Sequence, residues 1–166
     1  TRNFYPKKGK INSHGFRFLH LSWLQQNLNY FKTDEIFNFE YSLNTNNQNQ
    51  LQFGFNNKYV FLFSSFDPSR TDGAIALPTD SDYNYNEWNL SYRLNFANPF
   101  IFNSELTYGG FFNGTKLSST GTIGYRFQPK FIFTVQWDYN KIKLPKPYSS
   151  NDIILIRPKF DFTFTK

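Results

Sequence analysis

Apolar and polar residues alternate along most of the chain. In the segment 51–63, six of the seven odd positions are apolar, against two of the seven even positions of 50–62. A period of two residues is typical of a β-strand, because successive side chains point to opposite faces of the sheet. At about 3.3 Å per residue this strand spans roughly 40 Å, and a tilt of about 45° reduces its height to about 30 Å, the thickness of a bilayer core. Strands of soluble proteins usually stop after about 5–6 residues.

The same alternation predicts eight long strands and no helix. Within the weaker region 1–34, the apolar phase switches between Phe18 and Leu19, which predicts a bulge near 18–19. Short turns and longer loops follow one another along the chain, and the Asn113-Gly114 pair predicts a tight turn among the longer loops. The predicted strands cover residues 14–24, 35–45, 50–64, 83–97, 100–113, 116–127, 130–141 and 152–165.

Long strands with short turns at one end and long loops at the other are typical of bacterial outer-membrane barrels. We therefore predict an all-β fold, a transmembrane antiparallel up-and-down β-barrel, with residues 1–166 as a single domain or part of one. The alternation is still running at Lys166, and lipid does not tolerate open sheet edges, so we expect a segment of a larger barrel. We expect the loops 65–82 and 141–151 outside the cell and the turns 97–99 and 128–130 in the periplasm.

The composition agrees with strands that have one apolar and one polar face. The 166 residues include 22 Phe, 11 Tyr and 3 Trp, yet also twenty Asn, with a net charge of +6 and a mean hydropathy of −0.57. This aromatic content is too high for a disordered chain. Apolar runs such as 153–156 are far shorter than the roughly 20 residues of a membrane helix. Without Cys there is no disulfide and no thiolate site, and the lack of Met predicts a processed or partial chain.

We expect the rings of the apolar face to contact lipid, with Trp residues in an aromatic girdle near the strand ends. The alternative is that these rings form the core of a soluble β-sandwich. A girdle would include Trp23, Trp88 and Trp137. The predicted lipid-facing residues are Trp88, Phe133, Trp137, Phe160 and Phe162.

The charges lie on the opposite face, where they either line a pore or fill a narrow lumen with ion pairs and amides. Antiparallel pairing about the turn 97–99 brings Arg93 close to Glu105. Pairing about the loop 141–151 brings Asp138 close to Arg157. We predict two ion pairs that lock neighbouring strands and obstruct the lumen, because an unpaired charge in a partly dry lumen is unfavourable.

Other candidate sites are weaker. His14 and His20 lie near Ser13 and Ser22, but without an acid partner nearby they predict ordinary strand positions and not a nucleophilic pair. No metal-ligand spacing, phosphate-binding loop or paired-carboxylate motif is present, so we predict neither a cofactor nor an enzyme. Nucleic acid is an unfavourable partner, because the rings and the charges occupy opposite faces. Lys143 and Lys146 predict a stiff cationic outer loop that contacts lipopolysaccharide phosphates or a partner protein, or is simply solvated.

Five segments carry a family resemblance. They resemble, in order and spacing, the C-terminal barrel region of a Bacteroidota family of unknown function, whose full-length members carry an N-terminal β-sandwich like a carbohydrate-binding module. The resemblance implies an outer-membrane location and a barrel that continues into further strands, but no catalytic residue, because the sandwich lies outside this sequence. The segments are GAIALPTDSDYNYNEW (73–88), GGFFNGT (109–115), GYRFQPKF (124–131), DYNKIKLPKPYSS (138–150) and IRPKFDFTFTK (156–166).

The sequence thus favours an integral outer-membrane barrel with a structural or anchoring role in a larger surface assembly. A porin-like pore for small solutes is the first alternative. A secreted, soluble glycan-binding sandwich that uses exposed Tyr and Trp is the second.

Overall fold

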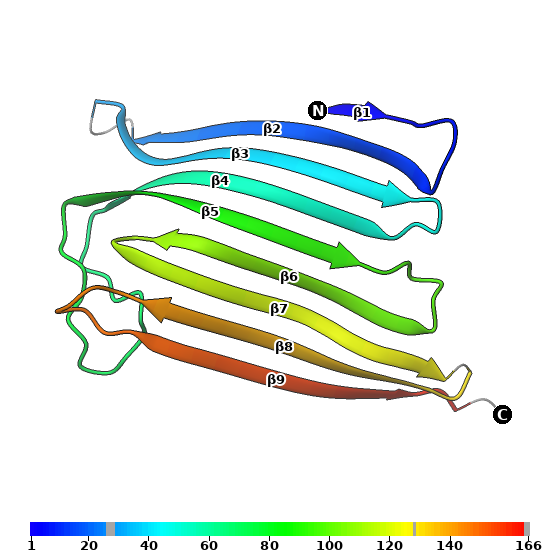
Figure 1. The fold of residues 1–166 in the computed structure, drawn as a ribbon. Coiled ribbons are helices and arrows are strands. Elements are labelled where there is room, and N and C mark those ends of the chain that lie inside the picture. Colours follow the sequence, from blue (N-terminus) through cyan, green and yellow to red (C-terminus); the bar gives the residue numbers. More distant parts are fainter. Residues whose placement is uncertain (26–28, 128, 165–166) are drawn as a thin grey trace.

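The structure is a computed structural model that describes residues 1–25, 29–127 and 129–164. These residues form one sheet of nine antiparallel strands in chain order, each paired with its sequence neighbours (Figure 1). The strands are β1 (Arg2–Phe4), β2 (Ile11–Gln25), β3 (Phe31–Thr45), β4 (Gln50–Leu62), β5 (Ser81–Arg93), β6 (Phe100–Phe111), β7 (Gly114–Phe127), β8 (Phe131–Lys143) and β9 (Asn151–Phe162).

The all-β, up-and-down architecture is confirmed, and the eight predicted strands correspond to β2–β9. The short β1 was not predicted, because three residues are too few to display alternation. Part of the predicted turn 128–130 and the end of the predicted strand 152–165 lie outside the described residues. The sheet is open, with β1 and β9 at its two edges, so a closed barrel is not seen.

The bulge predicted at 18–19 was wrong. β2 pairs with β3 without interruption from Ser13 to Trp23, and the register shifts lie beyond these two residues. Phe18 therefore faces the same side as its partner Phe39, whereas Leu19 faces the other side, opposite Asn38. The apolar residues of β2 are divided between the two faces, which is why the sequence pattern was weak there.

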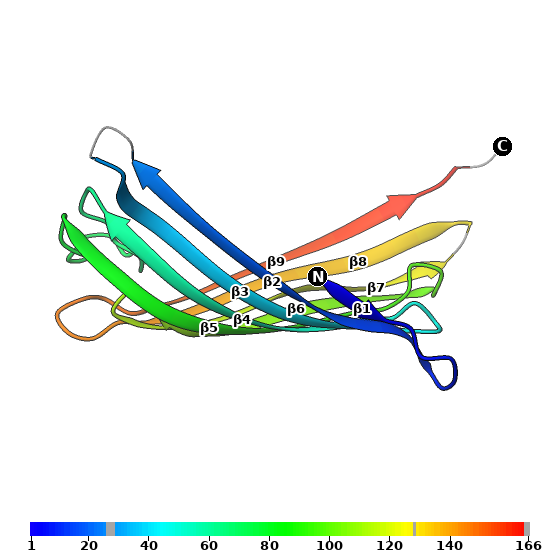
Figure 2. The same ribbon diagram turned by 90° about the horizontal axis from the view of Figure 1, so that it is seen from above.

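The sheet is twisted and curved, and its outer strands bend toward the same side (Figure 2). The face seen in Figure 1 is the convex one, and the concave face lies behind it. Twist of this kind follows from the right-handed preference of strands of L-residues. Alternation assigns the apolar residues of β3–β9 to the convex face and the polar residues to the concave face.

Side-chain burial is concentrated in one small cluster where the long loops meet. In the loop 63–80, Leu77 and Ser69 are fully buried, and Leu77 exchanges two backbone hydrogen bonds with Phe66, at 2.8 and 3.2 Å. The Asn151 side-chain amide donates to the Ser69 carbonyl at 3.0 Å. The loop therefore reaches from the ends of β4 and β5 to the start of β9 and ties these elements together (Figure 1).

Phe112 is the aromatic centre of the same region. It lies in the two-residue turn between β6 and β7 with a φ of +52°, an unfavourable conformation for a bulky residue. Its ring lies 5.5 Å from that of Phe66 and 5.4 Å from that of Tyr83. Aromatic packing under the long loop holds this turn, whose two residues are Phe112 and Asn113 and not the predicted Asn113-Gly114 pair.

Replacing Leu77 with Ala should loosen the loop 63–80 without unfolding the sheet. Removal of a fully buried Leu side chain typically costs about 2–5 kcal/mol, and here that loss falls on one loop. We expect faster trypsin cleavage at Arg70 in native conditions and an unchanged far-ultraviolet spectrum. Ile75→Ala is the matched control, because Ile75 in the same loop is 55% exposed. Equal cleavage of the two variants would contradict a role of Leu77 as the anchor.

Candidate functional site: the two faces of the sheet

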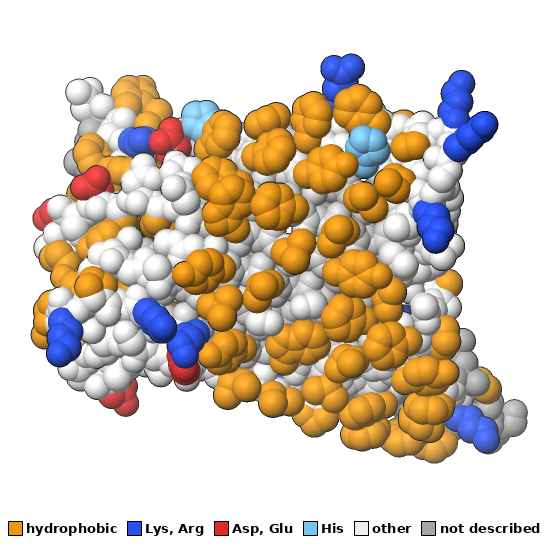
Figure 3. Space-filling view, viewed as in Figure 1, with side chains coloured by type: hydrophobic (Ala, Val, Ile, Leu, Met, Phe, Trp, Pro, Cys, Tyr) orange, Lys and Arg blue, Asp and Glu red, His pale blue; other side chains and the backbone are white. Residues whose placement is uncertain are grey.

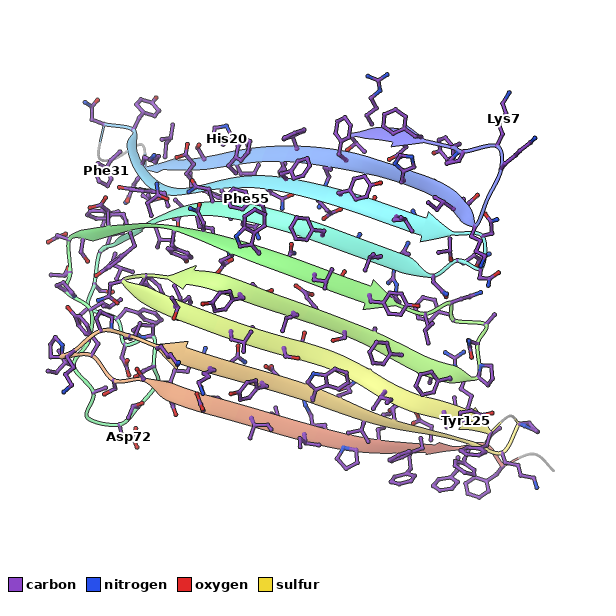
Figure 4. The ribbon with its side chains drawn as sticks, viewed as in Figure 1. Lys7, His20, Phe31, Phe55, Asp72 and Tyr125 are labelled. Atoms are coloured by element: carbon purple, nitrogen blue, oxygen red, sulfur yellow. The ribbon has the colours of Figure 1, made fainter. Side chains whose placement is uncertain are left out.

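The convex face carries a broad apolar band that no described element covers (Figure 3). Interstrand pairs on it join aromatic rings directly: Phe133 faces Phe160, and their centroids lie 4.6 Å apart. Phe55 and Tyr125, from β4 and β7, lie toward opposite ends of the band (Figure 4). Many of its large side chains are exposed, among them Trp88 at 49% and Phe162 at 62%. All five residues predicted to face lipid lie on this face, namely Trp88, Phe133, Trp137, Phe160 and Phe162.

The apolar band stops on the long-loop side along a line that crosses the strands (Figure 3). Beyond this line the same convex face is mainly polar on β3, β5, β8 and β9, whereas on β4 Tyr59 and Phe61 follow Asn57 on this face. Asn57 there donates hydrogen bonds of 2.8 Å to Asn84 and Asn86. The first polar residues beyond the line are Glu35, Asn57, Asn86, Lys141 and Asp152.

The predicted tryptophan girdle is wrong in two respects. Trp88 and Trp137 lie in the middle of their strands and not near strand ends. Trp23 does lie near a strand end, but its partner is Asp34, which places it on the concave face. Trp137 covers Gly121 on the convex face and donates to the Ser119 hydroxyl at 3.2 Å.

The concave face holds a cavity of about 530 Å³ between β4 and β9. Amides, hydroxyls and four charged side chains line most of it. Arg93 lies at one end, where it donates to the Gln50 side chain and packs 5.5 Å from the centre of the Phe96 ring. The charged lining residues are Arg93, Glu105, Asp138 and Arg157.

Neither predicted ion pair occurs in the described part of the chain. Arg93 is paired in register with Asn103, and Glu105 with Ser91, so the two charges are diagonal neighbours. Arg93 instead binds Gln50. The turn-based registers were correct, but a nearer polar partner takes the charge: Gln50 on β4 faces Arg93 directly and accepts its hydrogen bond.

Asp138 and Arg157 follow the same rule. Arg157 pairs with Gln136, and Asp138 with Leu155, which makes the charges diagonal again. The Asp138 carboxylate accepts a 2.6 Å hydrogen bond from Asn140 on its own strand. The four charges surround one cavity without forming the predicted lock.

Other ion pairs, which the sequence analysis missed, occur on the concave face. Arg17 and Glu40 face each other directly across β2 and β3 at 2.9 Å. Lys58 and Glu87 approach to 2.5 Å, and Glu87 is nearly buried. The Arg17–Glu40 pair could have been found from the register, but the predicted bulge near 18–19 obscured it.

His20 has an acid neighbour, which the sequence did not predict. Its Nε2 lies 3.0 Å from Glu35 and 3.3 Å from the Ser22 hydroxyl. In a nucleophilic triad the acid binds one ring nitrogen of the histidine and the serine hydroxyl binds the other. Here Glu35 and Ser22 both contact Nε2, so these three residues do not form such a triad. Lys32 also binds Glu35, at 2.8 Å, so the group is a polar network beyond the apolar band.

The loop 63–80 is ordered by Asp67 at its start. The Asp67 carboxylate accepts hydrogen bonds from the Ser69 hydroxyl at 2.7 Å, the Ser69 backbone at 2.9 Å and the Thr71 backbone at 3.0 Å. The Ser69 hydroxyl above all, and then the backbone donors, lower the pKa of Asp67. These bonds therefore stabilise the loop above the ordinary pKa of the carboxyl and weaken as the pH falls through the lowered value.

The predicted cationic loop is in part buried. Ile142 and Leu144 are buried, whereas Lys143 and Lys146 are exposed. The part of the chain that the structure describes contains no group of three or more histidine or acidic side chains placed to hold a metal ion. It also contains no helix that is long and apolar enough to cross a membrane.

The molecule is thus a single-sheet, all-β protein with one apolar and one polar face. No family model, curated protein or solved structure matches the chain.

The structure predicts no energetic coupling between Arg93 and Glu105. In a double-mutant cycle with Arg93→Gln and Glu105→Gln, unfolded by urea in detergent micelles, the effects should add within about 0.5 kcal/mol. The cycle of Arg93→Gln with Gln50→Ala is the comparison, and there we expect coupling of about 0.5–1.5 kcal/mol from the hydrogen bond. A larger coupling energy between Arg93 and Glu105 than between Arg93 and Gln50 would contradict this expectation and support the ion pair predicted from the sequence.

Proposed function

We propose that this chain forms part of the wall of a β-barrel in a bacterial outer membrane, with a structural or anchoring role in a larger surface assembly. The observation that carries the proposal is the uncovered apolar band of the convex face, which is bounded by polar residues on the long-loop side (Figure 3). Outer-membrane barrels present an apolar band about 25 Å tall to lipid and polar side chains to the lumen.

The strand lengths support the same proposal. The eight long strands have 12 to 15 residues, against about 9–11 in the apolar part of a tilted membrane strand. The extra residues extend beyond the apolar band on the long-loop side. Membrane strands need this length, whereas strands of soluble sheets usually do not.

The open edges of the sheet also favour a wall within a larger closed structure. The Thr163 backbone amide donates a hydrogen bond to the Lys130 carbonyl, just before β8. In this register the odd residues of β9 bond to β8, so the backbone groups of its even residues point away from β8 toward the open edge. Pro158 is one of these even residues and supplies no donor. An antiparallel strand beside β9 would satisfy the remaining groups, as lipid requires.

A porin-like pore is the second candidate function. The polar cavity of about 530 Å³ favours it, together with the four charges that line this cavity without pairing with one another. A lumen without the predicted lock offers a hydrated path. The glycan-binding sandwich is less well supported, because a sandwich needs two packed sheets and the described residues form one.

Spin labels test the membrane proposal directly. In vesicles, labels at Phe133 and Phe162 should be accessible to oxygen from the lipid, whereas labels at Thr134 and Thr163 should be accessible to water-soluble nickel complexes. Phe133→Arg should reduce the free energy of folding into the bilayer by about 2–4 kcal/mol if this position lies near mid-depth, and Thr134→Arg by less. Equal accessibility of both sets of labels would refute the proposal.

Single-channel conductance separates the two candidate functions. If the lumen conducts, insertion of the protein into planar bilayers should give discrete current steps, and Arg93→Glu should shift ion selectivity toward cations because the lining gains negative charge. Glu40→Gln, outside the cavity lining, is the control for an unspecific change of charge. Inserted protein without current steps would favour the anchoring role.

A further inference from the structure

Two lysines lie on the convex face where the apolar band ends. On β8, Lys141 and Lys143 follow Tyr139 on the same face, and Tyr139 is the last apolar residue of the strand there. Lys141 pairs across the sheet with Leu117, and Leu117 pairs with Tyr108. Cationic and apolar groups from three neighbouring strands are therefore placed side by side at this line.

These residues surround a hollow of about 160 Å³. Its lining consists of Tyr108, Thr115, Leu117, Lys141 and Lys143. Thr115 has Gly110 as its neighbour on β6, and Tyr85 of β5 packs against this glycine. The hollow combines an apolar surface continuous with the band, one hydroxyl and two ammonium groups.

The charge around the hollow is predominantly positive. Lys141 lies 3.4 Å from Asp152, and both side chains are well exposed, so this ion pair is weak. Lys143 takes part in no ion pair among the described residues, and the exposed Lys146 follows in the adjoining loop. Two lysines of the lining thus lie beside one carboxylate, which favours an anionic ligand.

We propose that this hollow binds the phosphate group of an anionic membrane lipid. Lys141 and Lys143 supply the positive charge, the Thr115 hydroxyl donates a hydrogen bond, and Tyr108 and Leu117 pack against the upper part of an acyl chain. The inference rests on the membrane function proposed above and names the ligand at the border of its apolar band. A lipid fits better than an acidic protein segment because the floor of the hollow is continuous with the apolar band.

Quenching of Trp137 by brominated lipids tests the site. Trp137 lies on the same face of β8, four residues from Lys141, at about 13 Å along the strand. The variant Trp23→Phe/Trp88→Phe retains only this tryptophan. In vesicles, dibrominated phosphatidylglycerol should quench Trp137 more strongly than dibrominated phosphatidylcholine. Lys141→Gln/Lys143→Gln should reduce the relative binding constant for phosphatidylglycerol by about fivefold for each lysine.

Two variants serve as controls. Lys7→Gln/Lys8→Gln removes the same charge at the opposite end of the sheet, where Figure 4 shows Lys7, and should leave quenching unchanged. Lys141→Arg/Lys143→Arg keeps the charge and should retain the preference for phosphatidylglycerol. If Lys7→Gln/Lys8→Gln also lost the preference for phosphatidylglycerol, the effect would be one of general charge, and the proposed site would be overturned.

The remaining outcomes separate this inference from the proposed function. Absence of quenching by either lipid would refute membrane insertion itself. Strong but equal quenching by both lipids would leave the membrane function standing and overturn the lipid site. Displacement of phosphatidylglycerol by millimolar inorganic phosphate would assign the site to free anions, and displacement by a poly-glutamate peptide alone would assign it to an acidic protein partner. Either result would overturn the proposal.

Discussion

Backbone hydrogen bonds between neighbouring strands hold this structure together, because very few of its side chains are buried. The buried apolar residues of the described chain are Leu77, Ile142 and Leu144, all in the region where the long loops meet. A soluble domain of this size would normally bury a large apolar core. Here the hydrogen bonds between strands pair the backbone amides and carbonyls of the inner strands, and the apolar side chains remain on the convex face. Everything proposed about the protein depends on what covers that face.

The strand alternation made most of the fold predictable from the sequence. A period of two residues fixes both the strand and the face of each side chain, so the eight long strands and all five apolar-face residues followed directly. The alternation failed at β2, where Leu19 and Leu21 are apolar on the concave face. It also gave no information about the loop 63–80, because the burial of Leu77 depends on contacts with distant strands.

The candidate site was predictable in register but not in its interactions. The turns correctly placed Arg93 and Glu105 on one face of neighbouring strands. Whether two such charges meet depends on which polar groups compete, and Gln50 from a third strand takes the Arg93 side chain. A pairing rule that considers two strands at a time cannot detect a competitor on the third. The same reason hid the hollow beside Lys141, which needs side chains from β6, β7 and β8 together.

The border of the apolar band also fixes the inclination of the strands. One laterally paired row runs from Phe39 on β3 through Trp88 to Lys141 on β8. On β3 this row lies about three residues inside the border, and on β8 about one residue outside it, a displacement of about four residues over five strand steps. With about 3.3 Å per residue and about 4.8 Å between strands, the strands incline by roughly 30° to the normal of the border. Closed barrels need strands tilted by about 35–45°, so the sheet already has much of the shear that closure around an axis requires.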